Sequence, residues 1–318
     1  MTEKPCLTCK NVLPVSLFRA DKNNKTTGLR ATCTPCQGKR NAATRIDRRR
    51  AEKEAEAAKA AASSMRTLFV LSDTHHPEHD RRVWAATLEL LGDVKPDELI
   101  LCGDFLEMGS VSQHGGAVLD KLTEDFMAGI VALKALREAV GDGCRITYLE
   151  GNHESRLSRF LASRTPSLME SLSIEVGLKL KDLGVDWVPE AKQPITRGDL
   201  DFTHGHQDLR ERPSKYHGGK MAEIYGRPGR TVVYGHTHKP QVYSRPAVGG
   251  VVSAVGLGCG RTLSPGWLHG AQAGWVHQVA VVYLTPAGRG YVYPITFQHG
   301  QAVWYGKLYG ARETADAA

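Results

Sequence analysis

Five short clusters of Asp, Asn and His residues lie in the middle of the chain, and each follows an apolar run. Carboxylate, amide and imidazole groups in mixture suit borderline divalent metal ions better than calcium. Two such ions held about 4 Å apart can activate a nucleophile and neutralise the charge of a phosphate ester. Each cluster alone is a weak signal, but the five in succession predict a dinuclear metal site that hydrolyses phosphate esters. The clusters are Asp73-Thr74-His75, Gly103-Asp104, Gly151-Asn152-His153-Glu154, His204-Gly205-His206 and Gly235-His236-Thr237-His238.

Manganese is the favoured ion for this predicted site, and iron, nickel, zinc or magnesium are the alternatives. Glycines stand directly before Asp104, Asn152 and His236. Because glycine adopts backbone conformations that other residues avoid, we expect the chain to turn sharply inward at these three positions.

The elements that must position the clusters follow from the hydrophobic pattern. Short apolar runs alternate with longer amphipathic segments, which is typical of an α/β domain of the α+β type. Ligands gather at the carboxyl ends of strands in such sheets, where all five clusters lie. The predicted strands are Thr67–Leu71, Glu98–Cys102, Arg145–Leu149, Leu200–Thr203 and Thr231–Tyr234. The predicted helices are Arg82–Leu91, Leu119–Val140 and Ser155–Ser163.

Beyond Val251 the pattern changes to repeated short strands, which predict a largely antiparallel sheet that closes the fold. These strands are expected at Gln278–Leu284, Tyr291–Gln298 and Gln301–Tyr309, with a hairpin turn at His299-Gly300.

The five clusters together resemble the motifs of the calcineurin-like metallophosphoesterases, and the resemblance covers about residues 68–243. It implies a β-sandwich flanked by helices. It also implies that Asp104 bridges two metals and that a water or hydroxide between them attacks phosphorus. His153 would stabilise charge or protonate the leaving oxygen. By the same resemblance, one metal is held by Asp73, His75, Asp104 and His238, and the other by Asp104, Asn152, His204 and His236.

The chain departs from the family pattern at one position of the second motif. That motif usually reads Gly-Asp-x-x-Asp, and the last position here is Glu107. We expect Glu107 to lie behind the ligands rather than on a metal.

Three residues outside the predicted metal ligands are candidates for substrate contact. Arg156 and Arg159 follow the Asn-His pair at the start of a predicted helix, where a guanidinium could grip a phosphate. A solvated helix face is the alternative. His206 is the best candidate for substrate contact among the histidines that the motifs leave unassigned, although a structural role is the alternative for each of them.

Two Cys-x-x-Cys pairs near the N-terminus predict a structural zinc site. The pairs are Cys6 with Cys9 and Cys33 with Cys36. This segment resembles small zinc modules found on nucleases and other DNA-processing proteins of phages and bacteria. The alternatives are a purely structural zinc knob and a module that docks a protein.

Composition divides the chain into three predicted parts: a zinc-binding module at residues 1–45, a charged, Ala-rich helical linker at 46–64 and a catalytic domain at 65–318. Residues 1–50 hold twelve Lys and Arg against three Asp and Glu, so the basic charge of the chain lies in this segment. Such a distribution indicates that the module, rather than the main domain, contacts a polyanion. The basic residues after the second Cys pair are Lys39, Arg40, Arg45 and Arg48 to Arg50.

The sequence therefore predicts a metal-dependent phosphodiesterase that acts on DNA or another nucleic acid. A phosphatase or small-molecule phosphodiesterase acting on nucleotides or cyclic nucleotides is one alternative, and a non-catalytic nucleic-acid-binding protein is another. No apolar run approaches the roughly 20 residues of a membrane helix. We expect a cytoplasmic protein, in the host cytoplasm if a phage encodes it, and leave its oligomeric state open.

Overall fold

A computed structural model describes residues 2–62, 64–112, 121–209, 215–266, 269 and 273–310, and the side chains of residues 49–62 are outside the described set. The predicted basic side chains Arg49 and Arg50 therefore lie outside it. The chain divides into two compact units, Met1–Ser64 and Met65–Ala318. Among the described helices, none is long and apolar enough to cross a lipid bilayer.

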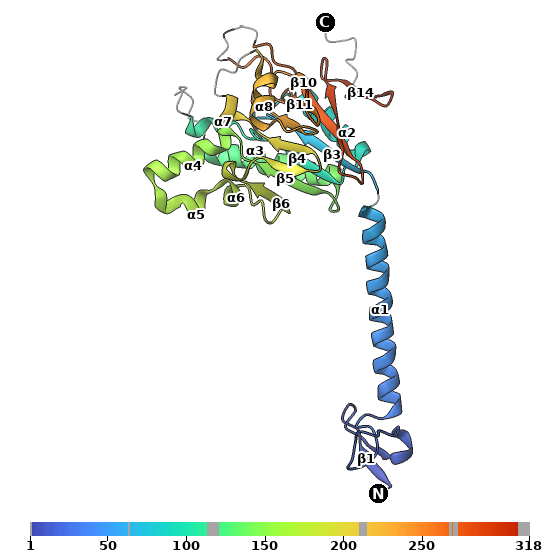
Figure 1. Cartoon of the computed structure of the whole chain (residues 1–318). Helices are drawn as coiled ribbons and strands as arrows, with labels where there is room; N and C mark the ends of the chain where they lie inside the picture. The colour runs from blue at the N-terminus through green and yellow to red at the C-terminus, as the bar shows by residue number, and fades with distance from the viewer. Residues whose placement is uncertain are drawn as a thin grey trace. The chain divides into compact units, whose positions relative to one another are not determined.

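The first unit is a small hairpin fold followed by a long helix (Figure 1). Strands β1 (Glu3–Pro5) and β2 (Val12–Pro14) pair antiparallel, and the 3-10 helix η1 (Val15–Leu17) follows them. Phe18 packs with the Cys residues in a very small core. Helix α1 (Thr34–Ala62) begins earlier than the predicted linker: Cys33 stands directly before it and Cys36 lies in its first turn. The predicted boundary at residues 45 and 46 thus falls inside one continuous helix.

The second unit contains a mixed six-stranded sheet. Strands β3 to β6 are parallel, and β12 and β13 add antiparallel strands at one edge. In spatial order the strands are β13 (Gly290–Thr296), β12 (Gln278–Leu284), β3 (Arg66–Leu71), β4 (Glu98–Leu101), β5 (Arg145–Leu149) and β6 (Val185–Val188).

A five-stranded sheet faces the first one. Strands β8, β9 and β11 are parallel, with antiparallel strands at both edges. In spatial order the strands are β10 (Gln241–Ala247), β11 (Gly250–Gly256), β9 (Thr231–Tyr234), β8 (Leu200–Thr203) and β7 (Ile195–Arg197).

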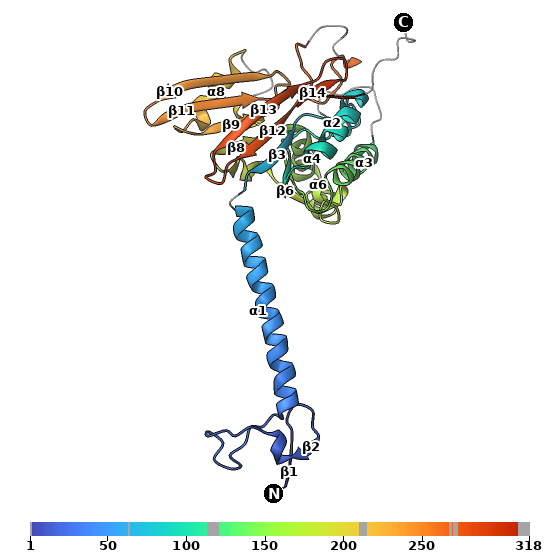
Figure 2. The ribbon, with the colours of Figure 1, turned by 90° about the vertical axis from the view of Figure 1, so that its right-hand side faces the viewer.

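Alternating side chains of the strands build the layers. In β3, Leu68 and Val70 join the core between the two sheets, while Phe69 and Leu71 join the core beneath the helices. Figure 2 shows α2, α3 and α4 gathered on the same side of the sheets. Helix α8 (His217–Tyr225) packs on the outer side of the five-stranded sheet. The helices of the first layer are α2 (Arg81–Val94), α3 (Leu122–Val140), α4 (Asn152–Arg164), α5 (Met169–Leu172) and α6 (Ile174–Gly177).

The predicted β-sandwich flanked by helices is therefore confirmed, with two corrections at the C-terminal end. The late strands do not form one closing sheet, because β12 and β13 extend the six-stranded sheet while β14 and β15 pair separately. The segment predicted as one strand at Gln301–Tyr309 is a hairpin of β14 (Ala302–Trp304) and β15 (Lys307–Tyr309). The predicted turn at His299-Gly300 is confirmed by paired hydrogen bonds between Gln298 and Gln301.

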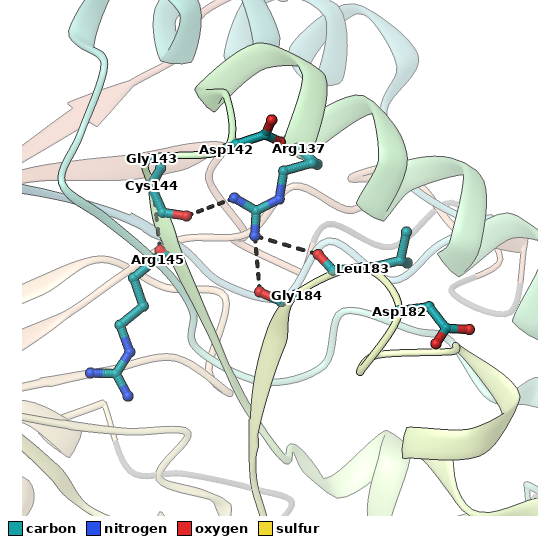
Figure 3. Close-up of a pocket in the computed structure, with 8 residues that line it drawn as sticks. All are labelled: Arg137, Asp142, Gly143, Cys144, Arg145, Asp182, Leu183 and Gly184. Carbon is teal, nitrogen blue, oxygen red and sulfur yellow. Dashed lines mark hydrogen bonds between the residues drawn. The ribbon is translucent and has the colours of Figure 1, made fainter. Parts of the chain in front are cut away.

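Arg137 joins the C-terminal end of α3 to two neighbouring loops by hydrogen bonds (Figure 3). Nη1 of Arg137 donates to the carbonyl oxygens of Gly141 and Cys144 at 3.1 and 2.6 Å. Nη2 donates to the carbonyl oxygens of Leu183 and Gly184 at 3.4 and 2.9 Å. A guanidinium that satisfies four backbone carbonyls holds β5 and β6 in place and has a structural function.

We expect Arg137→Leu to lower the free energy of unfolding of the second unit by roughly 2–3 kcal/mol, since carbonyl groups lose charged donors. The matched control is Arg145→Leu, which removes an exposed ion pair with Asp186 and should cost below about 1 kcal/mol. Urea unfolding followed by tryptophan fluorescence reports on this unit alone, because all five tryptophans lie beyond residue 65. Equal losses in the two variants would contradict the structural role.

Candidate metal centre

The five predicted clusters meet at one edge of the two sheets. Their loops follow β3, β4 and β5 of the first sheet and β8 and β9 of the second. Backbone hydrogen bonds join the loops directly: the Asp73 N–H donates to Gly103 O at 3.1 Å, and the His75 N–H donates to Asp104 O at 3.0 Å. Across the two sheets, the His236 N–H donates to the Asp73 carboxylate at 3.0 Å. The strand ends therefore converge as a rigid cluster of loops.

One group of donor atoms comes from Asp73, His75 and His238, all of which are buried. Nε2 of His238 lies 3.1 Å from Oδ1 of Asp73 and 3.1 Å from Nε2 of His75. Two imidazole nitrogens at this distance either share a hydrogen bond or bind one metal ion. The donor set fits a borderline divalent metal.

A second group comes from Asp104, His204 and His236, with Asn152 beside them. Oδ1 of Asn152 lies 3.1 Å from Nε2 of His204 and 2.9 Å from Nδ1 of His236. Nε2 of His204 lies 3.3 Å from Oδ2 of Asp104. One carboxylate oxygen and one amide oxygen thus converge with two imidazoles, and this set of donors also fits a divalent metal.

The two groups share the side chain of Asp104. Its Oδ2 lies 3.3 Å from Nε2 of His204 in one group and 3.8 Å from Nε2 of His75 in the other. Its Oδ1 accepts a hydrogen bond from the backbone N–H of His153 at 2.9 Å. One oxygen is therefore held by the backbone while the other faces both groups. The structure brings the side chains of all seven expected ligands close together, and it also places a nitrogen of His153 near His75 and Asp104.

Several of these residues have a strained backbone. Side chains other than glycine rarely adopt positive φ, and each such residue costs on the order of 1–3 kcal/mol. Such residues cluster at functional sites, where the surrounding structure holds them in place. The φ angles are 55° at Asp73, 53° at His75, 49° at Asp104, 69° at His236 and 56° at His238.

The glycines before the ligands serve close packing more than turning. A Cβ atom on Gly151 would lie 2.2 Å from Oδ1 of Asp104, and one on Gly235 would lie 1.9 Å from Oγ of Ser72. Of the three glycines, only Gly103 has a positive φ, 85°, so the conformational freedom of glycine is needed at that position, and close packing explains the other two. Any larger residue at Gly151 would displace Asp104.

Glu107 lies behind His75, as the sequence predicted. Its Oε2 accepts a hydrogen bond from Nδ1 of His75 at 2.8 Å, which leaves Nε2 of that imidazole free to bind a metal. Buried Arg261 donates to the same oxygen through Nη1. Arg261 was not predicted from the sequence, because it lies after β11, outside every motif, and only the folded chain brings it to Glu107.

Glu154 holds the loop that carries Asp104 through hydrogen bonds to its backbone. Its carboxylate accepts from the backbone N–H groups of Asp104, Leu106 and Gly151 at 3.0, 2.9 and 2.9 Å, and from the hydroxyl of Tyr148 at 2.8 Å. Burial, with the charge of Asp104, raises the pKa of Glu154 to about 7. The sequence contained Glu154 in its third cluster but gave no signal of this function.

His153 stands beside both donor groups. Its Nδ1 donates to the carbonyl oxygen of Glu107 at 2.6 Å, which directs Nε2 toward the centre, 3.8 Å from Oδ2 of Asp104. The centres of the His153 and His75 rings are 4.4 Å apart. Burial lowers the pKa of His153 to about 3, so the imidazole is neutral near pH 7. By contrast, although burial also acts on His204, the Asp104 carboxylate raises its pKa to about 9.

The predicted substrate contacts lie around this centre in different ways. Nη2 of Arg156 donates a hydrogen bond to Nε2 of His153 at 2.9 Å. Arg159 is exposed and reaches back to the carbonyl oxygen of Asn152 at 3.4 Å. His206 pairs with Glu190 at 3.0 Å, and its ring centre lies 5.3 Å from that of His204. Arg159 and His206 therefore lie next to predicted ligands, and Arg156 lies next to His153.

The predicted structural zinc ligands also come together. One sulfur atom from each of Cys6, Cys9, Cys33 and Cys36 lies within 4.8 Å of the others, an arrangement that fits zinc bound by four thiolates. The backbone N–H of Cys33 donates to Sγ of Cys6 at 3.3 Å and lowers the pKa of Cys6 to about 6. A thiol with a lowered pKa is readily deprotonated, as a zinc ligand must be.

Comparisons with known proteins give a family match and distant structural likenesses. A family model described as calcineurin-like phosphoesterase matches residues 66–240. The gene 54 protein of Mycobacterium phage L5 is 29% identical over 180 residues, which are 54% of this chain and 69% of the phage protein.

Two solved structures are similar at low identity. Vacuolar protein sorting 29 from Cryptosporidium parvum is 15% identical, with a TM-score of 0.42, over 78% of this chain and 99% of that one. The phosphoesterase Yfce from E. coli is 18% identical, with a TM-score of 0.37, over 73% of this chain and all of that one, 100%.

We expect Asp104→Ala to remove two divalent ions per chain and to leave the zinc of the Cys cluster in place, because one carboxylate oxygen faces both donor groups. Elemental analysis of the purified protein by mass spectrometry measures this loss. The matched control is Asp182→Ala, which removes an exposed carboxylate elsewhere and should change no metal content. Loss of a single ion in Asp104→Ala would contradict the bridging position.

Proposed function

The chain belongs to the calcineurin-like phosphoesterase family, and we propose that it is a metal-dependent phosphodiesterase with two metal ions, acting on DNA or another nucleic acid. The observation that carries this proposal is the position of Asp104, whose Oδ2 faces both groups of donor atoms. A carboxylate in that position suits a pair of divalent ions better than a single one. Manganese is the favoured ion, with iron, nickel, zinc or magnesium as alternatives.

The metal ions, when bound, supply positive charge that polarises the phosphate and activates water near neutral pH. The side chains of this protein perform the remaining tasks. Asp104 fixes the separation of the two donor groups, because its other oxygen is held by the His153 N–H. Glu107 orients His75, and Glu154 holds the loop that carries Asp104. Burial of these groups excludes water and strengthens each electrostatic contact.

We assign to His153 the transfer of a proton to the leaving oxygen. Its Nδ1 donates to the Glu107 carbonyl and its Nε2 accepts from Nη2 of Arg156, so Nε2 becomes available when Arg156 turns to the substrate phosphate. Burial keeps the imidazole neutral with Nε2 unprotonated before substrate binds, so Nε2 would first take up a proton from water, which the negative charge of the phosphate favours, and then pass it to the leaving oxygen. Arg156, which donates a hydrogen bond to this histidine, is positioned to bind a non-bridging oxygen of the same phosphate.

A nucleic-acid substrate is supported by the first unit. Lys39, Arg40, Arg45 and Arg48 are all exposed on α1, directly after the second Cys pair. Exposed Lys and Arg residues bind phosphate backbones by charge and without base specificity. The relative from Mycobacterium phage L5 supports the proposal that the protein acts inside a host bacterium.

We expect His153→Asn to lower kcat on a chromogenic phosphodiester by at least about 100-fold, the usual contribution of a positioned general acid. Its metal content should stay nearly unchanged, since the seven predicted ligands remain. Steady-state kinetics with manganese, paired with elemental analysis, separate the two effects. Wild-type activity in His153→Asn would show that another group supplies the proton.

Changing Lys39, Arg40, Arg45 and Arg48 together to Gln should weaken binding to single- or double-stranded DNA and flatten its salt dependence, because each phosphate contact contributes a slope of about 0.7–0.9. The measurement is fluorescence anisotropy of a labelled oligonucleotide across a salt series. The matched control removes the same charge from exposed positions of the second unit: Lys134, Lys179, Lys181 and Arg289. A larger effect in the control would place the DNA contact on the second unit.

A further inference from the structure

A hollow of about 340 Å³ lies between α2 and α3, outside the metal centre. Its polar end is formed by His76 and His79, and Trp84 stands beside them. The opposite wall consists of Met127, Val131 and three alanines of α3. The short alanine side chains leave the space open, and Met127 and Val131 are 65% and 66% exposed at its rim.

Two ring nitrogens of the histidines that line this hollow have no hydrogen-bond partner in the described part of the chain. These atoms are Nε2 of His76 and Nδ1 of His79, and both are buried. The His76 side chain is only 2% exposed, so bulk water does not reach most of it. Buried polar atoms in folded proteins are nearly always bonded, so such nitrogens indicate a ligand that has polar atoms of its own.

The remaining walls suit a flat, largely apolar molecule. The rings of His76 and Trp84 pack edge to face with centres 4.5 Å apart, and His76 also packs on Phe105 at 4.7 Å. The volume lies at the lower end of the range for small-molecule sites, about 300–1,000 Å³, which fits one ring system with its sugar. A planar ring with hydrogen-bonding groups along its edge matches both the walls and the imidazoles.

The hollow and the metal centre share one wall. Consecutive residues of the two loops lie on opposite sides of this wall. His75 and Asp104 belong to the metal centre, whereas His76 lines the hollow and Phe105 packs against His76 from the core beneath the helices. The wall is closed by hydrogen bonds from the His76 N–H to Phe105 O at 2.8 Å and from the Glu107 N–H to His76 O at 2.9 Å. A ligand in the hollow therefore lies one loop away from a phosphate at the metals.

We propose that this hollow binds a nucleobase, with its edge hydrogen-bonded to His76 and His79 and its faces against Trp84 and the apolar side chains of α3. The base belongs either to a nucleic-acid strand or to a free nucleotide. This inference rests on the proposed function for its account of the neighbouring phosphate, but base binding itself requires no hydrolysis.

The direct test measures binding of the four common nucleosides to the full chain by saturation-transfer NMR and titration. Ala128 is half-buried in the wall, so Ala128→Phe fills the hollow without removing a core side chain. Lys134→Phe adds the same ring at an exposed position of α3 outside the hollow. We expect wild type and Lys134→Phe to bind at least one nucleoside equally, and Ala128→Phe to bind it at least tenfold more weakly. Absence of binding to wild type, or equal binding by Ala128→Phe, overturns the proposal.

A second pair of variants tests the hydrogen bonds. His79→Leu should weaken nucleoside binding several-fold, and His79→Gln, which keeps a hydrogen-bonding group, should restore part of it. Equal binding by wild type and His79→Leu overturns the assigned role of this imidazole. Thermal melting of each variant beside Lys134→Phe identifies any loss that comes from misfolding.

Hydrolysis of a short oligonucleotide with and without an abasic site then distinguishes the source of the base. If a strand supplies it, the abasic site raises KM in wild type and leaves KM unchanged in Ala128→Phe. If nucleosides bind but the abasic site has no effect, the hollow serves a free nucleotide. If no oligonucleotide is cleaved, the proposed function fails, and the nucleoside titration still decides whether a base binds.

Discussion

The rest of the second unit depends on one constraint: a single oxygen of the Asp104 carboxylate must face two groups of donor atoms. Its other oxygen is held by the His153 N–H, and its backbone N–H by Glu154. Gly151 lacks a side chain where any Cβ would strike this carboxylate. Strain at five of the ligands, Asp104 among them, shows that the loops hold these side chains against their backbone preference. A cation pair between the groups would compensate for burying two carboxylates among imidazoles.

The two-sheet architecture provides the rigidity that this arrangement needs. Each donor group takes ligands from loops of both sheets, so the distances between donors within a group are set by the packing of one sheet on the other. That packing is an apolar core to which each strand contributes alternate side chains, such as Leu68 and Val70 from β3. Close-packed interiors transmit small displacements, so a change in this core should be felt at the metals.

Much of the site was predictable from the sequence because each group of ligands lies close to its strand along the chain. Each cluster follows directly after an apolar strand, and the strand order of an α/β sheet brings such ends to one edge. Arg261 was not predictable, because nothing near it in the chain marks a partner of Glu107. The pairing of β12 with β3 was missed for the same reason, since these strands are far apart in sequence. At Gly235 the local signal was correctly noticed but its cause was different, namely the close approach of Ser72.

The most direct test of the account is anomalous diffraction from crystals soaked in manganese. The account predicts two anomalous peaks about 4 Å apart, one beside His75 and His238, the other beside His204 and His236, with Oδ2 of Asp104 between them. A single peak at full manganese occupancy, or two peaks with Asp104 bound to only one of them, would contradict it.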